Sequence, residues 1–328
     1  MLRGMKRLNR YENRILKIVK LGGKLIRFKQ FGFSTKTAEG FRFPIYVLEI
    51  GKEKAIKRNV AGLVAGVHGL ETIGIRVLLD FLDDLFARKT SDLYREIKDG
   101  ELGIVCIPIL NPGGVAMKRR SNPGGVDLMR NSGVEAVKAP FFFGGHKISN
   151  VFPYYRGNVL QSESKVLDRF YAEYLLPAEN PMIPVVDVHS GFGAVDHVWW
   201  PYAGTHEQCV DEGLFQKIAN HLTTKFNHIL YRFGPQSETY TTHGDLWDRM
   251  YNEYQKIKPF IDMNSPRFLP LTLEIGTWSD IKLDPWKVFR KRGIFNPTRE
   301  LKQESIISHR KFLADVLRLA KTKPMDLV

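Results

Sequence analysis

Four strand-like runs of apolar residues constrain this chain more than any other feature of its sequence. They cover residues 59–67, 102–110, 183–189 and 268–275. The first run, which contains VAGLVAGV, is apolar on both faces, as is typical of a central strand in a parallel sheet. Apolar residues at helical spacing follow or separate these runs in residues 72–88, 162–176, 207–226, 244–257 and 298–321. Strands that alternate with helices predict an α/β fold with a mixed, mostly parallel central sheet and helices on both faces.

Weaker segments complete this outline. Shorter strand-like runs occupy residues 24–35, 43–51, 196–202 and 228–233. A polar, glycine-rich stretch between residues 115 and 156 has little periodicity, and loops of this length in a compact domain usually serve a function. Within it, Phe141–Phe143 can either pack locally or form a lid.

Composition and charge exclude several classes of protein. The net charge is +14 and the sequence pI is about 9.6, but the cations are spread along the chain, so nucleic acid is not expected as the main partner. Cys106 and Cys209 form no CxxC pair, which argues against a disulfide framework and a cysteine zinc site. Apolar runs are too short for a membrane span, and the basic N-terminal stretch does not resemble a signal peptide. We therefore expect a cytoplasmic protein.

A histidine directly follows one of the strand-like runs and ends another. GLVAGVHGLETIG contains His68, with Glu71 three residues later, and PVVDVHSG contains His189. Ligands in open α/β sheets bind outside the carboxyl ends of the strands. Two imidazoles and one carboxylate are the ligand set of a catalytic zinc, which keeps its fourth position open. The pattern predicts one zinc per chain, where the metal would activate water and polarise a carbonyl.

Other charged residues fit the same chemistry. Glu274, in the apolar run TLEIG, is a candidate general base, because a carboxylate in such a strand is costly without a task. Arg119, Arg120 and Arg130 lie in the long loop, where arginine suits an oxyanion or a substrate carboxylate. Asp127 is a candidate partner for a metal-binding histidine.

Five short motifs occur in a fixed order, namely HGLE, NPGG, GVDLMRN, DVHSG and TLEIG. In this order they resemble the zinc metallocarboxypeptidases and the related zinc-dependent deacylases, such as succinylglutamate desuccinylase and aspartoacylase. The resemblance spans residues 60–278 and implies a zinc exopeptidase-like fold. It implies that His68, Glu71 and His189 bind zinc and that Glu274 is the general base.

The resemblance also implies roles around the metal. Arg120 corresponds to the arginine that stabilises the oxyanion, with neighbouring Arg119 as an alternative, and Asp127 corresponds to the partner of His68. Arg130 and Asn131 are implied to bind substrate. Tyr240, in YTTHGDL, resembles a mobile tyrosine that covers the bound substrate.

One residue departs from the family pattern, and two carry open alternatives. Met129 stands where the family has an asparagine that shares the substrate carboxylate with the arginine, and methionine cannot donate a hydrogen bond. That loss costs on the order of 1.5–3 kcal/mol. In the family, the stretch after the tyrosine that covers the substrate lines the side-chain pocket and an acidic residue there selects basic substrates, so the resemblance implies this role for Asp245 or Asp248. Asp245 can equally be the first-turn carboxylate of the helix that follows.

These features predict a single zinc-carboxypeptidase-like domain over residues 1–328. Its parts are N-terminal strands with a basic extension to residue 58, a catalytic core over 59–280 and a helical segment over 281–328. We expect a hydrolase of amide or peptide bonds acting on peptides or N-acyl amino acids, and first of all a metallocarboxypeptidase. The alternatives are a deacylase or murein-peptide amidase, and, from another class, a non-catalytic binding protein. An acidic substrate would account for the basic charge. The sequence predicts no particular oligomeric state.

Overall fold

The computed structural model describes residues 2–191, 193–262, 265–277, 295–296 and 299–327. Its strands are β1 (Ile26–Phe33), β2 (Pro44–Ile50), β3 (Val60–Ala65), β4 (Gly103–Ile107), β5 (Met182–Gly191), β6 (Asp196–Trp200), β7 (Tyr231–Pro235) and β8 (Arg267–Gly276). Its α-helices are α1 (Leu2–Gly22), α2 (Glu53–Arg58), α3 (Thr72–Ala87), α4 (Asp92–Asp99), α5 (Pro112–Met117), α6 (Ser162–Phe170), α7 (Glu212–Thr224), α8 (Leu246–Ile257) and α10 (Arg299–Arg318). The end of the resemblance at Trp278, the predicted boundary at residues 280–281 and the predicted helix start at Thr298 lie outside the described residues.

The described strands form one eight-stranded sheet in the order β1-β2-β4-β3-β5-β8-β6-β7. Four of its seven strand pairings are parallel, including those that join β4, β3, β5 and β8 at the centre. The pairings β1–β2, β2–β4 and β6–β8 are antiparallel. The predicted mixed, mostly parallel sheet is therefore confirmed, and its buried central strands are the ones that the apolar runs indicated.

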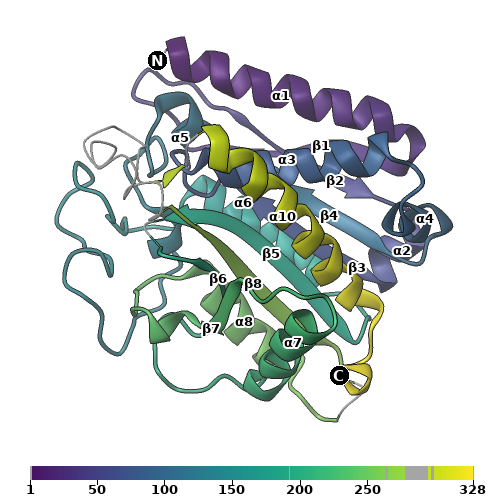
Figure 1. The fold of residues 1–328 in the computed structure, drawn as a ribbon. Helices are drawn as coiled ribbons and strands as arrows, with labels where there is room; N and C mark the ends of the chain where they lie inside the picture. Colours follow the sequence, from purple (N-terminus) through teal and green to yellow (C-terminus); the bar gives the residue numbers. More distant parts are fainter. Residues whose placement is uncertain (1, 192, 263–264, 278–294, 297–298, 328) are drawn as a thin grey trace.

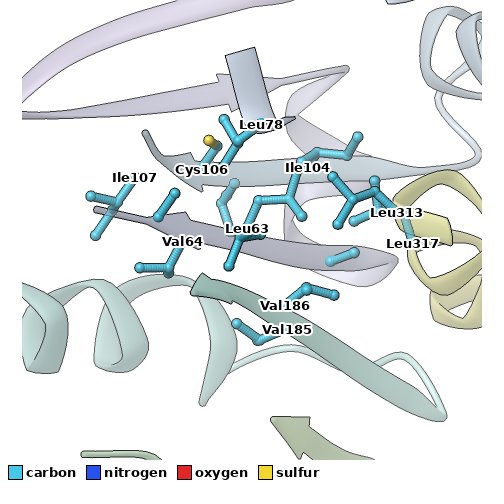
Figure 2. Close-up of a cluster of buried hydrophobic side chains, with 14 of the residues drawn as sticks. Leu63, Val64, Leu78, Ile104, Cys106, Ile107, Val185, Val186, Leu313 and Leu317 are labelled. Atoms are coloured by element: carbon cyan, nitrogen blue, oxygen red, sulfur yellow. The ribbon is translucent and has the colours of Figure 1, made fainter. Parts of the chain in front are cut away.

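Helices cover both faces of this sheet. Helices α3 and α10 contact each other and β5, and Figure 2 shows Leu78 of α3 with Leu313 and Leu317 of α10 gathered against side chains of β3 and β4. Helix α8 and the helical turn after α6 pack on Phe268 of β8 through Trp247 and Tyr171. Figure 1 shows this layered arrangement, with α10 in front of the strands and α1 along the top of the view.

Helix α1 was not predicted from the sequence. It buries Leu8, Tyr11, Ile15 and Ile18, which lie at helical spacing, and packs against α3 and α5. Frequent lysines and arginines on its other face hide this pattern in a simple search for apolar runs. Among the described residues, no helix is both long and apolar enough to span a bilayer.

Chain connectivity determines where a site can form. From β3 the chain returns to β4 on one side, and later to β5 on the other side of β3. The sheet therefore has a topological switch point beside β3, where loops leaving the strand ends diverge and leave a crevice. His68 follows β3, while His189 and Glu274 lie at the carboxyl ends of β5 and β8.

Candidate active site

The turn that carries His68 needs glycine at two positions. Gly66 has a φ of +68°, a conformation that side chains disfavour. A Cβ on Gly69 would lie 2.1 Å from the carbonyl carbon of Gly114, so the HGLE turn fits only a glycine there. Asn111 of the NPGG turn holds the two turns together, because its side-chain amide donates to the Val67 carbonyl at 3.1 Å. The NPGG motif thus supports the residues around His68.

His68 is buried and fixed by Asp127. Its Nε2 lies 3.0 Å from Oδ1 of Asp127, and the Arg120 guanidinium and His68 hold the pKa of Asp127 well below its usual range despite burial. An ionised carboxylate only accepts hydrogen bonds, so Nε2 of His68 donates to Asp127. The Nδ1 atom of His68 lies 2.8 Å from Oε1 of Glu71, and it makes no hydrogen bond among the described residues.

His189 has a carboxylate partner that the sequence analysis did not assign. Its Nδ1 lies 3.0 Å from Oε2 of Glu71, and its Nε2 lies 2.9 Å from Oδ2 of Asp187. Asp187 is fully buried and also accepts a hydrogen bond of 2.9 Å from the Trp247 indole. Residues i and i+2 of a strand face the same side, so the DVH motif contained the signal for this contact.

These residues fit a zinc ion. One ligand atom each from His68, Glu71 and His189 lie within 4.8 Å of one another, and all three side chains are buried. Two nitrogens and an oxygen suit zinc, and each imidazole has a carboxylate behind its second nitrogen, as metal-binding histidines usually do. Nδ1 of His68 faces Glu71 in this cluster and makes no hydrogen bond among the described residues, which supports a metal rather than a structural role.

Glu274 lies beside this cluster on β8. In the register of the sheet it is opposite His189, and a Cβ on Gly191 would lie 2.2 Å from its Oε1. Glycine at position 191 therefore leaves room for the Glu274 carboxylate. Burial and the nearby Glu71 carboxylate raise the pKa of Glu274 to about 8. A group that titrates near neutrality is suited to proton transfer.

Of the two neighbouring arginines in the long loop, Arg120 enters the site and Arg119 does not. Nη1 of Arg120 donates to Oε1 of Glu71 at 2.6 Å and its Nε to Oδ2 of Asp127 at 2.9 Å. Arg119 is exposed and does not line the cavity. The Tyr154 ring, which sequence reasoning missed, lies 5.3 Å from the Arg120 guanidinium and 6.0 Å from that of Arg130.

A cavity of about 590 Å³ opens in front of these groups. Its lining includes the three ligand residues together with Arg120, Arg130, Tyr240, Asp245 and Glu274. Arg130 is buried and donates to the carbonyl oxygens of Phe143 and Met129, and its charge acts on nearby Tyr240. The sheet, the long loop and the segment before α8 therefore bring together seven of the predicted functional residues around the ligand Glu71, with Asp127 directly behind His68.

Asn131 does not line this cavity. Its amide nitrogen donates to the carbonyls of Arg156 and Val159, and its oxygen accepts from the Gln161 amide at 2.8 Å. The predicted substrate contact of Asn131 has no support in this arrangement, because its amide group is committed to the loop. Met129 does line the cavity.

The two aspartates near Tyr240 differ in role. Asp245 caps α8, since its Oδ1 accepts from the backbone amides of Trp247 and Asp248, and the same side chain lines the cavity. Both alternatives for Asp245 are thus compatible with its position. Asp248 accepts hydrogen bonds from the backbone amides of Ala203 and Gly204 and does not line the cavity. Phe142 packs on His146, whereas Phe143 borders the cavity.

Fold and site together define a metal-dependent hydrolase with a zinc-type ligand set at a sheet switch point. The family model of the zinc carboxypeptidases matches residues 26–286, and the chain belongs to this family. The family is zinc-dependent, so the chain is a hydrolase of the zinc metallopeptidase class. No sequence among the curated proteins matches the chain.

Solved structures share the fold at low sequence identity. Bovine thrombin-activatable fibrinolysis inhibitor, in complex with tick carboxypeptidase inhibitor, matches with a TM-score of 0.69 and 17% identity over 95% of this chain and 96% of that chain. Carboxypeptidase A from Helicoverpa armigera has a TM-score of 0.62 and 15% identity over 94% and 70% of the two chains. A metallo-carboxypeptidase from Pseudomonas aeruginosa, bound to (2-guanidinoethylmercapto)succinic acid, has a TM-score of 0.54 and 12% identity over 94% and 69%.

Proposed function

We propose that the chain is a metallocarboxypeptidase that releases one C-terminal residue from a peptide. One observation carries the proposal, namely that a single cavity joins the ligand cluster, the carboxylate of Glu274 and the buried guanidinium of Arg130. The first two can activate water beside a carbonyl. The third offers a fixed cation to a substrate carboxylate, which an endopeptidase does not need.

Residues of the chain would divide the reaction between them. Zinc bound by His68, Glu71 and His189 would supply Lewis-acid activation of water and of the scissile carbonyl. Glu274 accepts the proton of the attacking water and then donates it to the leaving amine. Arg120 donates hydrogen bonds to the oxyanion that develops on the carbonyl.

The substrate end of the cavity supports an exopeptidase. Tyr240 lies beside Arg130, and the raised pKa of its phenol, caused mainly by burial, keeps the hydroxyl a hydrogen-bond donor. Asp245 adds a carboxylate to the same lining. We propose that it favours a basic leaving residue, such as lysine, arginine or diaminopimelate, through a charge-assisted hydrogen bond.

Product analysis by mass spectrometry tests this function. The zinc-loaded chain and its Glu274→Gln variant are each incubated with peptides that carry free or amidated C-termini. N-acyl amino acids and a cell-wall tripeptide are included in the same set. Loss of a single C-terminal residue from the free peptides only, abolished in the variant, is the expected result. Cleavage of amidated peptides at the same rate would contradict the role of Arg130.

Met129 favours a second candidate function. It lines the cavity but cannot donate a hydrogen bond to a terminal carboxylate. A deacylase or murein-peptide amidase of the same fold would not depend on that donor. Hydrolysis of only the acylated or cell-wall compounds would support this alternative. No hydrolysis of any compound would support a non-catalytic binding protein.

Organisation and location complete the proposal. We propose that residues 1–328 form one catalytic domain, since strands from residue 26 to residue 276 share one sheet. A cytoplasmic location stays a prediction, which localisation of a tagged chain in its own cell would test.

A further inference from the structure

Four residues form a row across the sheet beside the ligand cluster. His189 of β5 pairs with Glu274 of β8, Glu274 pairs with His197 of β6, and His197 pairs with Arg232 of β7. Paired residues on neighbouring strands present their side chains on the same face. His189, Glu274 and His197 all line the cavity. His197 therefore lies on the side of the general base that faces away from the metal ligands.

The proton of His197 has a defined position. The Trp199 indole Nε1 donates to Nδ1 of His197 at 3.1 Å. An indole nitrogen can only donate, so Nδ1 must hold a lone pair, and the neutral ring carries its proton on Nε2. Burial and the Arg232 cation lower the pKa of His197, which outweighs the opposite effect of Asp196. At neutral pH His197 is thus an uncharged ring with one N–H group left to donate.

Trp199 connects this ring to the substrate end of the cavity. It is buried, and its ring contacts that of Tyr240 edge to face at a centroid distance of 6.1 Å. Tyr240 in turn lies close enough to Arg130 to feel its charge. A series of contacts through His197, Trp199 and Tyr240 therefore runs from the general base toward Arg130, where the proposed function holds the leaving residue.

Arg130 can direct only part of its donor capacity to a substrate carboxylate. A carboxylate can accept about four hydrogen bonds, and a guanidinium has about five N–H groups. Arg130 already directs its Nε, Nη1 and Nη2 toward the carbonyls of Phe143 and Met129. Met129 contributes no donor. A neutral N–H group in fixed orientation would supply part of what the leaving residue lacks.

We propose that His197 is a substrate-binding residue whose Nε2–H group donates a hydrogen bond to an oxygen of the leaving residue. The oxygen belongs either to the terminal carboxylate or, in a residue such as diaminopimelate, to a side-chain carboxylate. The proposal rests on the proposed function, because it assigns the leaving residue to this side of Glu274. Arg232, next in the row, makes an anionic oxygen the better acceptor.

Histidine-selective ¹⁵N NMR tests the proton position without any activity. The expected spectrum of the full chain shows the Nε2–H tautomer for His197, identified by its loss in His197→Phe. In Trp199→Phe, which retains an aromatic ring but no donor, the ring should redistribute its proton between the two nitrogens. A Nδ1–H tautomer in the unmodified chain would overturn the proposal.

Binding and kinetics test the contact itself. (2-Guanidinoethylmercapto)succinic acid, a dicarboxylate, serves as the probe on the zinc-loaded chain. His197→Phe should weaken probe binding about ten- to a hundredfold and raise KM by a similar factor, with zinc affinity and kcat nearly unchanged. His197→Gln, which keeps an N–H donor, should recover part of the loss. Equal probe binding by the original chain and His197→Phe would contradict the contact.

Matched substrates distinguish the two sources of the oxygen and separate this proposal from the function. Peptides ending in alanine and in glutamate are compared in the original chain and in His197→Phe. An equal loss for both identifies the terminal carboxylate, whereas a loss only for glutamate identifies the side chain. If His197→Phe hydrolyses both peptides with the same KM and kcat as the original chain, this inference is overturned and the proposed function is left intact. A chain that binds zinc and shows the expected tautomer, but hydrolyses nothing, overturns the proposed function instead.

Discussion

Zinc binding should displace two protons from this site, and a single substitution should remove one of them. Without the metal, two groups hold protons at neutral pH. The Asp187 and Glu71 carboxylates raise the pKa of His189 well above its usual value, against the opposite effect of burial. Burial and Glu71 raise the pKa of Glu274 to about 8. Both protons compensate for excess negative charge.

The number of protons released follows from the directions of these two pKa shifts. At pH 7 the His189 ring is protonated, and it must lose its Nδ1 proton to bind a metal. The double positive charge of the ion favours the ionised form of Glu274, which releases its proton as well. We expect about two protons per zinc for the unmodified chain and about one for Glu274→Gln. Above pH 8 the Glu274 contribution should fade, because its carboxyl is then ionised before the metal arrives.

Isothermal titration calorimetry measures this release directly. Zinc is titrated into the metal-free chain at pH 7 in buffers with different ionisation enthalpies, and the slope of the observed enthalpy gives the proton count. Glu163→Gln is the matched control, because Glu163 is also a buried glutamate with a raised pKa but bonds to Thr35 and Asn122 instead. It should leave the count unchanged. An equal count for Glu274→Gln and the unmodified chain would refute the reasoning.

Three further substitutions test separate parts of the site. His68→Ala should abolish zinc binding in a chelator competition assay while the circular dichroism spectrum is retained; retained zinc would contradict the ligand assignment. Asp187→Asn should weaken zinc binding about 10- to 100-fold, measured in the same assay, and unchanged affinity would mean that this carboxylate does not orient its histidine. Gly191→Ala should displace the Glu274 carboxylate and lower kcat by on the order of a hundredfold, with zinc affinity preserved.

Much of the site could be predicted because strand ends are predictable. The central strands are apolar on both faces, so their limits are sharp in the sequence, and parallel strands bring their carboxyl ends to one edge. His68, His189 and Glu274 each lie at such an end, and the structure brings them together as expected. Predicting that these residues meet therefore required the strand ends and the order of the motifs, but no knowledge of side-chain packing.

What could not be predicted from the sequence depended on local rotation and on long-range register. Arg130 and Asn131 are neighbours in sequence, but they lie at the end of a short 3₁₀ turn over Leu128–Arg130, which rotates successive side chains by about 120°. One side chain therefore enters the cavity while the other enters the loop. His197 gave no signal, because its position opposite Glu274 depends on the antiparallel pairing of β6 with β8. A strand pattern alone cannot supply that register.

The balance of charge explains why the ligand cluster, Arg120 and Glu274 occur in one site. Four carboxylates lie in or next to the ligand cluster, namely those of Glu71, Asp127, Asp187 and Glu274, and Arg120 forms ion pairs with the first two. Among the described residues, no lysine or arginine forms an ion pair with Asp187 or Glu274. Buried negative charge of this kind needs either protons or a cation. A divalent ion bound to the imidazoles would make their Nε2–H groups more acidic and therefore better donors, so Asp187 gains a stronger partner at the moment when the proton on Glu274 is released.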